Sequence, residues 1–138
     1  EAALSGKVSI QNKNSWRPFL HVQDASSAFL LVLNAPLSLV SGQIYNVVGE
    51  NFQKKDLVTL IKKKNKNVAI LIEDSKKNNK RDYRVSAKKI KDKLHWRPTF
   101  SVQDGFNEVF DAVRKGMFID PYGFRHNAWF DDKVFQQI

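Results

Sequence analysis

The chain has 138 residues, 42% of them hydrophobic, and it contains no cysteine. This length fits one ordinary domain, and the hydrophobic content is enough for a folded core. The absence of cysteine excludes a disulfide scaffold and thiolate chemistry and suits a reducing compartment, so we expect a cytoplasmic protein. No apolar run approaches the roughly 20 residues that a membrane helix needs, so we expect no membrane contact.

The formal net charge of +9 would suit nucleic acid, because phosphate backbones attract lysine and arginine. Much of the excess lies at helix surfaces or in a loop, in runs at residues 54–55, 62–64, 76–77 and 88–93. Charge runs of this kind are usually solvated faces. We therefore do not expect nucleic acid as a partner. A stand-alone basic module that binds nucleic acid or a protein is kept as the alternative function.

The first part of the chain predicts two short strands. Residues 2–6 have the pattern of a helix end, and the alternation of polar and apolar residues over 7–11 predicts a half-buried strand. A turn is expected at 12–15, followed by a strand over 16–22. Because Pro18 cannot donate a hydrogen bond to a sheet, this second strand should lie at an edge or begin irregularly.

The middle of the chain predicts alternating helices and strands. A helix is expected over 24–34, and its apolar residues surround so much of its circumference that it should be largely buried. The near-continuous apolar run at 43–48 predicts a strand in a covered sheet. An amphipathic helix is expected over 53–64 and a further strand over 68–72.

The last part of the chain predicts a polar loop over 73–80 and an extended segment over 81–85. A helix with Ser86 as its N-cap should follow over 87–94, with its apolar residues facing inward. A capping-box pattern at 101–104 starts a final helix that reaches residue 115.

Arg17 is the first candidate binding residue, because it lies at the start of the expected edge strand, between Trp16 and Pro18. Its planar guanidinium group suits a diphosphate or a carboxylate. The alternative is a surface arginine that pairs with Asp24 or Glu50. The residue types and spacing leave both interpretations open.

Two other groups of residues accompany Arg17. His21 is expected to be a satisfied structural residue rather than a catalyst, and Asp24 a first-turn acid that accepts hydrogen bonds from its own helix. Arg81, Tyr83 and Arg84 form a second cluster, in which residues 81 and 83 point to the same side of an extended segment and suit a base or a phosphate. The alternative is an edge strand with ordinary surface charges.

The sequence lacks the motifs that would supply chemistry. It contains no glycine-rich dinucleotide loop, no tyrosine followed by lysine four positions later, and no nucleophile elbow. The three histidines are too scattered to suggest a metal site. We therefore assign no catalytic, cofactor-binding or metal-binding residue to this chain.

Four stretches in the same order and spacing resemble the C-terminal substrate-binding portion of the extended short-chain dehydrogenase/reductases, which are NAD-dependent sugar-nucleotide epimerases and dehydratases. They are Arg17 to Asp24, Gly42 to Val47, Arg81 to Ser86, and Leu94 to Pro98. One departure is His95, at a position where the family commonly has glycine. A residue with a side chain must there avoid or tolerate a left-handed conformation.

The resemblance implies a small mixed α/β substrate-binding domain over residues 1–116, normally completed by an N-terminal Rossmann domain that this chain lacks. The missing domain would hold NAD and a catalytic Tyr–Lys pair, so the fragment alone should be inactive. The full-length enzyme, expected to be a homodimer, would act on a nucleoside-diphosphate sugar. The aromatic tail, residues 117–138, should pack on this domain or on the missing one.

The resemblance also implies roles for single residues. Arg17 would contact the diphosphate of the sugar nucleotide, and Arg81 would approach the nucleotide together with Tyr83. His21 and Asp24 would be supporting residues that shape the junction between strand and helix, and Arg84 is carried as a third supporting residue. A degenerate relative that is kept for protein contacts is a further possibility.

Overall fold

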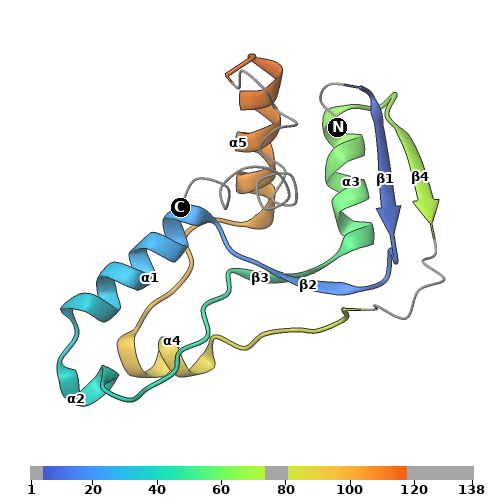
Figure 1. Cartoon of the computed structure of the whole chain (residues 1–138). Helices are drawn as coiled ribbons and strands as arrows, with labels where there is room; N and C mark the ends of the chain where they lie inside the picture. The colour runs from blue at the N-terminus through green and yellow to red at the C-terminus, as the bar shows by residue number, and fades with distance from the viewer. Residues whose placement is uncertain (1–4, 74–80, 118–138) are drawn as a thin grey trace, which may run out of the picture.

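A computed structural model describes residues 5–73 and 81–117 of the chain as a small mixed α/β structure (Figure 1). The predicted helix end at 2–6 lies mostly outside these residues, as do most of the predicted loop and of the aromatic tail. The elements in chain order are β1 Lys7–Gln11, β2 Trp16–Phe19, α1 Val22–Asn34, α2 Leu37–Val40, β3 Glu50–Gln53, α3 Lys54–Lys64, β4 Ala69–Glu73, α4 Lys88–Leu94 and α5 Val102–Arg114.

The elements β1, β4, α3 and α5 form one half of the molecule, which we call the sheet half (Figure 1). Strands β1 and β4 run parallel, with Lys7 opposite Ala69. Their side chains and the two helices share a buried cluster of apolar residues. It consists of Ile61, Val68 and Phe110, with Val8, Ile70 and Phe106 packed against it.

The helical half consists of α1, α2, α4 and the segment 43–48 (Figure 1). Its core surrounds Ile90, which is completely buried. The other buried members of this cluster are Ala28, Val48, Ala87, Leu94 and Trp96. The prediction that the apolar residues of the helix at 87–94 face inward is confirmed by the burial of Ile90 and Leu94.

Strands β2 and β3 form an antiparallel pair that connects the two halves (Figure 1). Trp16 lies opposite Gln53 and Phe19 opposite Glu50. Within the described residues β2 pairs with β3 alone, as Pro18 predicts for an edge strand. The strand ends before the predicted residue 22, because α1 begins there.

Local signals predicted most of the other boundaries. Helix α5 begins with the predicted capping box. Ser101 Oγ accepts a hydrogen bond from the backbone N–H of Asp104, and the Asp104 carboxylate accepts one from the backbone N–H of Ser101. The expected N-cap Ser86 lies one residue before the observed N-cap, and its hydroxyl accepts from the N–H of Lys88 at 3.3 Å. His95 tolerates the left-handed conformation, with φ at 56°.

The predicted strand at 43–48 is wrong. These residues are in neither a helix nor a strand. Ile44 is 82% exposed, and the Tyr45 hydroxyl donates to the carbonyl of Leu39 at 2.6 Å. A strand needs a neighbour that satisfies its backbone groups, and in the described part of the chain no strand pairs with this segment.

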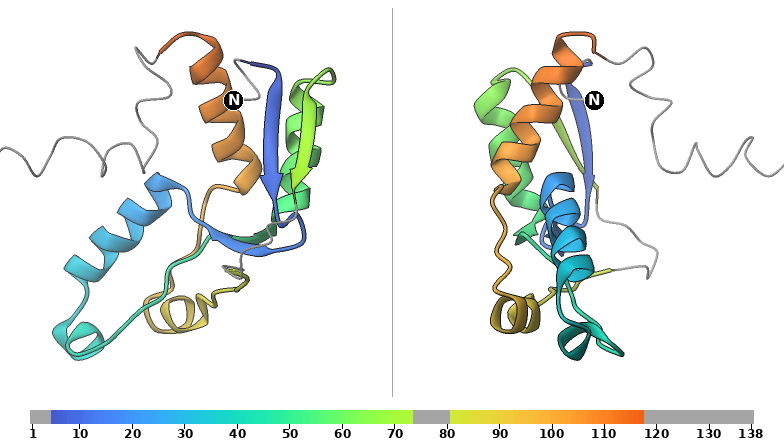
Figure 2. Two further views of the ribbon diagram at one scale, coloured as in Figure 1. Left: turned by 45° about the vertical axis from the view of Figure 1, so that its right-hand side comes forward. Right: turned by 90° about the vertical axis from the view of Figure 1, so that its left-hand side faces the viewer.

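The prediction that the helix at 24–34 is largely buried is also wrong. In α1 only Asp24 and Ala28 are buried, whereas Phe29, Leu30 and Leu33 are 74%, 60% and 71% exposed. Figure 2 shows α1 and α2 at the margin of the molecule, away from β1 and β4. The outer face of α1 is apolar but has no neighbouring element in the described structure that would cover it.

Candidate ligand-binding site

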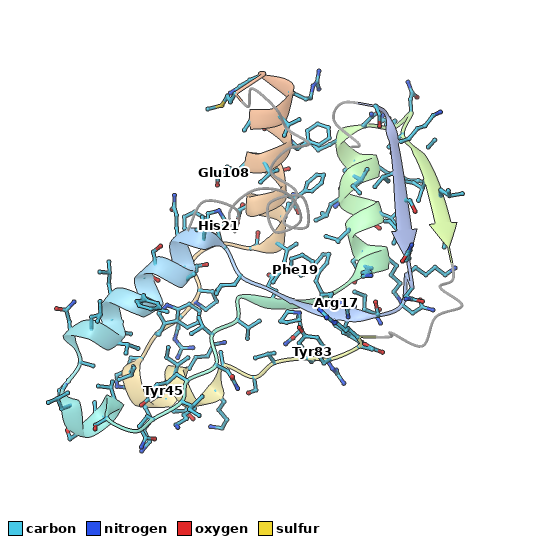
Figure 3. The ribbon with its side chains drawn as sticks, in the orientation of Figure 1. Arg17, Phe19, His21, Tyr45, Tyr83 and Glu108 are labelled. Atoms are coloured by element: carbon cyan, nitrogen blue, oxygen red, sulfur yellow. The ribbon has the colours of Figure 1, made fainter. Side chains whose placement is uncertain are left out.

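Residues 65 or more apart in the sequence meet beside β2, where a cluster of cations and aromatic rings forms. The guanidinium of Arg17 lies 5.9 Å from the centre of the Tyr83 ring, and that of Arg84 lies 5.0 Å from the centre of the Trp16 ring. Figure 3 shows Tyr83 close to Arg17 on the strand. Three of the predicted site residues, Arg17, Tyr83 and Arg84, are therefore neighbours.

Lys54 adds a third cation to this group. Its amine donates to the carbonyl of Gln11 at 3.0 Å. Partial burial lowers the pKa of Lys54, and repulsion from Arg17 lowers it further. A cation that is disfavoured by its surroundings gains from a nearby anion. We call Arg17, Lys54 and Arg84, with the rings of Trp16 and Tyr83, the cation cluster.

The alternative partners of Arg17 are engaged elsewhere. Asp24 accepts from the backbone N–H groups of Thr99 and Phe100 at 2.8 and 3.0 Å. Glu50 accepts from the N–H of Val102 at 3.1 Å. The Arg17 guanidinium instead donates to the carbonyl of Trp16 at 2.7 Å. The remaining donors of its guanidinium suit an anionic ligand.

The expectation that Asp24 accepts hydrogen bonds from its own helix is wrong. The side chain is only 1% exposed, and its two oxygens hold the segment that leads into α5. Asp24 thus joins the two halves of the molecule. A buried carboxylate requires such partners, because an unpaired buried charge is strongly disfavoured.

Residues 81–85 carry the second predicted cluster and lie in neither a helix nor a strand, so the edge-strand alternative is not observed. Arg81 is exposed and takes no part in the ring contacts described above. The segment is attached to the β2–β3 pair by two side chains, Asp82 and Asn51.

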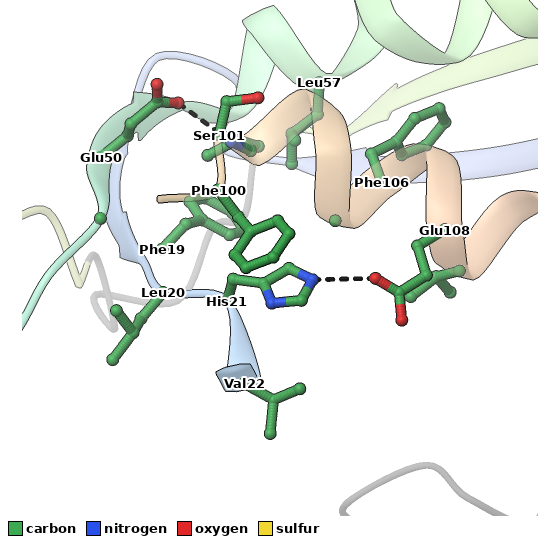
Figure 4. Close-up of a pocket in the computed structure, with 14 residues that line it drawn as sticks. Phe19, Leu20, His21, Val22, Glu50, Leu57, Phe100, Ser101, Phe106 and Glu108 are labelled. Atoms are coloured by element: carbon green, nitrogen blue, oxygen red, sulfur yellow. Dashed lines mark hydrogen bonds and ion pairs between the residues drawn. The ribbon is translucent and has the colours of Figure 1, made fainter. Parts of the chain in front are cut away.

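His21 lies away from this cluster, in the wall of a cavity of about 470 Å³ (Figure 4). Its Nδ1 accepts from the backbone N–H of Gln23 at 3.2 Å, and its Nε2 is 2.9 Å from Glu108 Oε2. The ring stacks on Phe100 with 4.3 Å between centres. Because Nδ1 accepts, the neutral tautomer with hydrogen on Nε2 satisfies both contacts.

The cavity wall is mainly apolar, with Glu50, His21 and Glu108 as its charged or titratable groups (Figure 4). Its remaining lining is Phe19, Leu20, Val22, Gly49, Leu57, Phe100, Ser101, Val102, Gly105, Phe106 and Val109. A Cβ atom at residue 105 would lie only 3.2 Å from the His21 ring, so glycine there permits the close approach of α5.

The described strand-to-helix junctions lack the glycine-rich turn that is typical of dinucleotide sites. NAD is usually held by a glycine-rich turn between a strand and a helix, where backbone N–H groups face the pyrophosphate. The described strand-to-helix junctions have His21 and Gln53 as the residues before α1 and α3. Neither junction has the glycines that a close phosphate approach requires. Among the described residues no cluster of potential metal ligands is found either.

Sequence reasoning missed several residues of the site. Lys54 appeared only as part of a charge run, and Asn51, Asp82 and Glu108 were not singled out. Asn51 meets residue 85, Asp82 meets residue 16, and Glu108 meets His21, across 34, 66 and 87 positions. No local spacing signals contacts over such separations.

Residues 1–48 match the model of the NAD dependent epimerase/dehydratase family, which is about a third of the chain. A comparison with curated proteins gives no match. Among the described residues, no helix is long and apolar enough to cross a membrane.

Solved structures of three enzymes share the fold. L-Threonine dehydrogenase from Phytophthora infestans has a TM-score of 0.74 and 17% identity over 84% of this chain and 39% of its own. UDP-glucose 4-epimerase from Thermotoga maritima, solved with UDP-glucose, has a TM-score of 0.70 and 22% identity, and the match covers 85% of this chain and 38% of the epimerase. dTDP-glucose 4,6-dehydratase from Bacillus anthracis, solved with NAD, has a TM-score of 0.64 and 25% identity, and the match covers 83% of this chain and 36% of the dehydratase. The chain thus spans well under half the length of these enzymes.

Proposed function

We propose that this chain is the substrate-binding part of an NAD-dependent epimerase or dehydratase that acts on a nucleoside-diphosphate sugar. In this proposal the chain binds the nucleotide and the diphosphate. The NAD site and the catalytic groups belong to an N-terminal Rossmann domain outside this chain, so the chain alone is inactive. Binding energy used here would position the sugar for the reaction in that other domain.

The observation that carries the proposal is the cation cluster. Arg17 and Arg84 lie against aromatic rings, and Lys54 has a lowered pKa because of partial burial and of Arg17. The neighbouring cations Arg17 and Lys54, with Arg84 on the adjoining Trp16 ring, suit a ligand with two negative charges. The planar rings suit a base or a sugar face. Arg81, at the exposed start of the same segment, is proposed to join them when the ligand is bound.

The family match over residues 1–48 supports an epimerase or dehydratase, and this range includes Arg17. The fold alone does not decide the substrate, because similar structures include both an L-threonine dehydrogenase and a UDP-glucose 4-epimerase. The choice between these ligand classes rests on charge. A cluster of cations favours a diphosphate over an amino acid, whose own ammonium group would be repelled.

The open face of α1 supports the proposed Rossmann partner. Phe29, Leu30 and Leu33 are mostly exposed, and so is Ile44 in the segment that was predicted to be a covered strand. A Rossmann domain would cover α1 and could offer a pairing strand to residues 43–48. We further propose that the complete enzyme is a homodimer.

Binding of UDP-glucose to the 138-residue chain, measured by isothermal titration calorimetry, tests the ligand class. We expect Arg17→Ala to weaken binding roughly 10- to 100-fold, because a charge-assisted hydrogen bond contributes about 1.5–3 kcal/mol. Lys62→Ala, which changes an exposed lysine in the last turn of α3, is the matched control and should leave affinity unchanged.

Two other ligands complete this experiment. L-Threonine should not compete with UDP-glucose, and competition would favour the substrate of the threonine dehydrogenases. A single-stranded oligonucleotide should bind weakly at physiological salt. Tight binding, with a logarithmic salt slope of about −0.7 for each neutralised phosphate, would favour the basic-module alternative. Equal affinity of Arg17→Ala and the unchanged chain for UDP-glucose would contradict the proposed site.

A further inference from the structure

The segment 81–85 presents two members of the cation cluster although no regular structure holds it. Tyr83 and Arg84 are exposed and belong to neither a helix nor a strand, yet their side chains contact Arg17 and Trp16. An exposed irregular segment normally samples many conformations. Specific contacts must therefore fix this part of the backbone.

Two side chains supply such contacts, one on each side of Tyr83 and Arg84. Asp82 Oδ1 accepts from the backbone N–H of Trp16 at 2.8 Å. Asn51 Oδ1 accepts from the N–H of Val85 at 2.9 Å, while its Nδ2 donates to the carbonyl of the same residue at 2.8 Å. The amide of Asn51 thus satisfies both backbone groups of one residue, as a neighbouring strand would.

The two anchors, which are the side chains of Asp82 and Asn51, connect the segment to two paired strands. Trp16 belongs to β2, Asn51 belongs to β3, and Asn51 lies opposite Pro18 in the antiparallel register. The two residues between the anchors, Tyr83 and Arg84, are those that touch the rings and guanidinium groups of the cluster. Figure 3 shows Tyr83 beside the β2–β3 pair. The anchors therefore set the distance between the segment and β2.

The contacts that Tyr83 and Arg84 make with β2 are too weak to fix the segment alone. Arg84 lies over the ring of Trp16, the residue next to Arg17 on β2. Partial burial lowers the pKa of Lys54, and the charge of Arg17 lowers it further, so Arg17 already has one cation nearby. Like charges at short distance disfavour one another, and the contacts between cations and rings are individually weak at exposed sites. We therefore expect the hydrogen bonds of Asp82 and Asn51 to hold Tyr83 and Arg84 against β2.

We infer that Asp82 and Asn51 are positioning residues, which hold Tyr83 and Arg84 in place against β2 before the ligand binds. The inference rests on the proposed function, because it assigns these residues to the binding of the nucleoside diphosphate. Neither residue need touch the ligand. Preorganisation of this kind increases affinity by reducing the entropy that is lost on binding.

Asp82 offers a test that separates position from charge. Asp82→Ala removes the acceptor and should weaken UDP-glucose binding to the 138-residue chain about 5-fold or more. Asp82→Asn removes the charge but keeps a side-chain oxygen that can accept from Trp16, and it should bind at least as well as the unchanged chain. Asp92→Ala is the control, since this exposed aspartate pairs with Lys88 on the surface of α4.

Asn51 offers a second, independent pair of variants. Asn51→Ala removes both hydrogen bonds to Val85, and Asn51→Asp removes the donor and places a carboxylate against the carbonyl. Both should weaken UDP-glucose binding about 5-fold or more, at a temperature where each variant is still folded by circular dichroism. Amide hydrogen exchange should become faster at Val85 in Asn51→Ala and faster at Trp16 in Asp82→Ala.

These experiments distinguish failure of the positioning role from failure of the proposed function. Loss of affinity in Asp82→Ala with retention in Asp82→Asn supports positioning. Equal loss in both Asp82 variants would assign a charge effect and overturn the inference, and so would faster exchange with unchanged affinity. If the unchanged chain binds no nucleoside diphosphate, the proposed function itself fails. If the chain binds but none of the variants differs from Asp92→Ala, only the positioning role fails.

Discussion

The sheet half and the helical half differ in how completely their apolar surfaces are covered. In the sheet half, α3 and α5 bury Ile61 and Phe110 against β1 and β4. In the helical half, Ile90 is buried, but α1 leaves Phe29 and Leu33 exposed on its outer face. The difference is one of degree, because Leu71 of β4 and Val109 of α5 are also exposed in the sheet half, by 59% and 60%. The sheet half nevertheless buries a core between its strands and two helices, whereas the outer face of α1 meets no described element.

The largest effect is expected in the core of the sheet half. Phe110→Ala should lower the free energy of unfolding by about 3–5 kcal/mol, because a buried aromatic ring is lost and a cavity remains. Urea denaturation followed by circular dichroism measures this change. A loss below about 1 kcal/mol would show that the two halves do not differ as described.

Asp24 tests the joint between the two halves. Asp24→Ala leaves the N–H groups of Thr99 and Phe100 without their carboxylate, and we expect a loss of about 3 kcal/mol. Asp24→Asn keeps one acceptor oxygen and should lose less. The same denaturation experiment applies. Equal and small losses in both variants would mean that the hydrogen bonds of Asp24 to Thr99 and Phe100 do not stabilise the fold.

The start of α5 gives a smaller effect that depends on pH. Ser101→Ala should cost about 1 kcal/mol, because the hydroxyl caps the helix. Hydrogen bonds from the Ser101 hydroxyl and N–H hold the pKa of Asp104 below its ordinary value. The folded state therefore favours the carboxylate, which stabilises the protein above about pH 4 and ceases to do so as pH falls further. Thermal melts should show a weaker pH dependence below pH 4 in Ser101→Ala, and an unchanged one would contradict this assignment.

The smallest effect is expected on the open face of α1. Leu33→Ala should change the free energy of unfolding of this chain by less than about 0.5 kcal/mol, because the side chain is 71% exposed. A loss comparable with that of Phe110→Ala would show that another segment or a second copy already covers this face. Joined to its proposed Rossmann domain, the chain should become sensitive to the same substitution.

Much of the sheet half could be predicted from the sequence, because its signals are local. The alternation at residues 7–11 predicted β1, and the capping box at Ser101 predicted the start of α5. The segment 43–48 was predicted wrongly for a physical reason. Its apolar pattern suits a covered strand, but a strand also needs a pairing neighbour, which the described part of the chain does not provide.

The candidate site was predictable only in part. Arg17, Tyr83 and Arg84 were named from residue type and from the family resemblance, and the structure brings them together. His21 and Asp24 lie elsewhere, and their partners could not be foreseen. The anchors Asp82 and Asn51 act through backbone groups distant in sequence, whose positions depend on the whole fold.

Hydrogen–deuterium exchange of the 138-residue chain, with and without UDP-glucose, would locate the ligand-binding residues. We expect the ligand to slow exchange at residues 16–19 and 81–85, whereas the exchange rates of the α1 amides should be the same as in the free chain. Unchanged exchange at both of these segments, or protection confined to other elements, would contradict the proposed binding site.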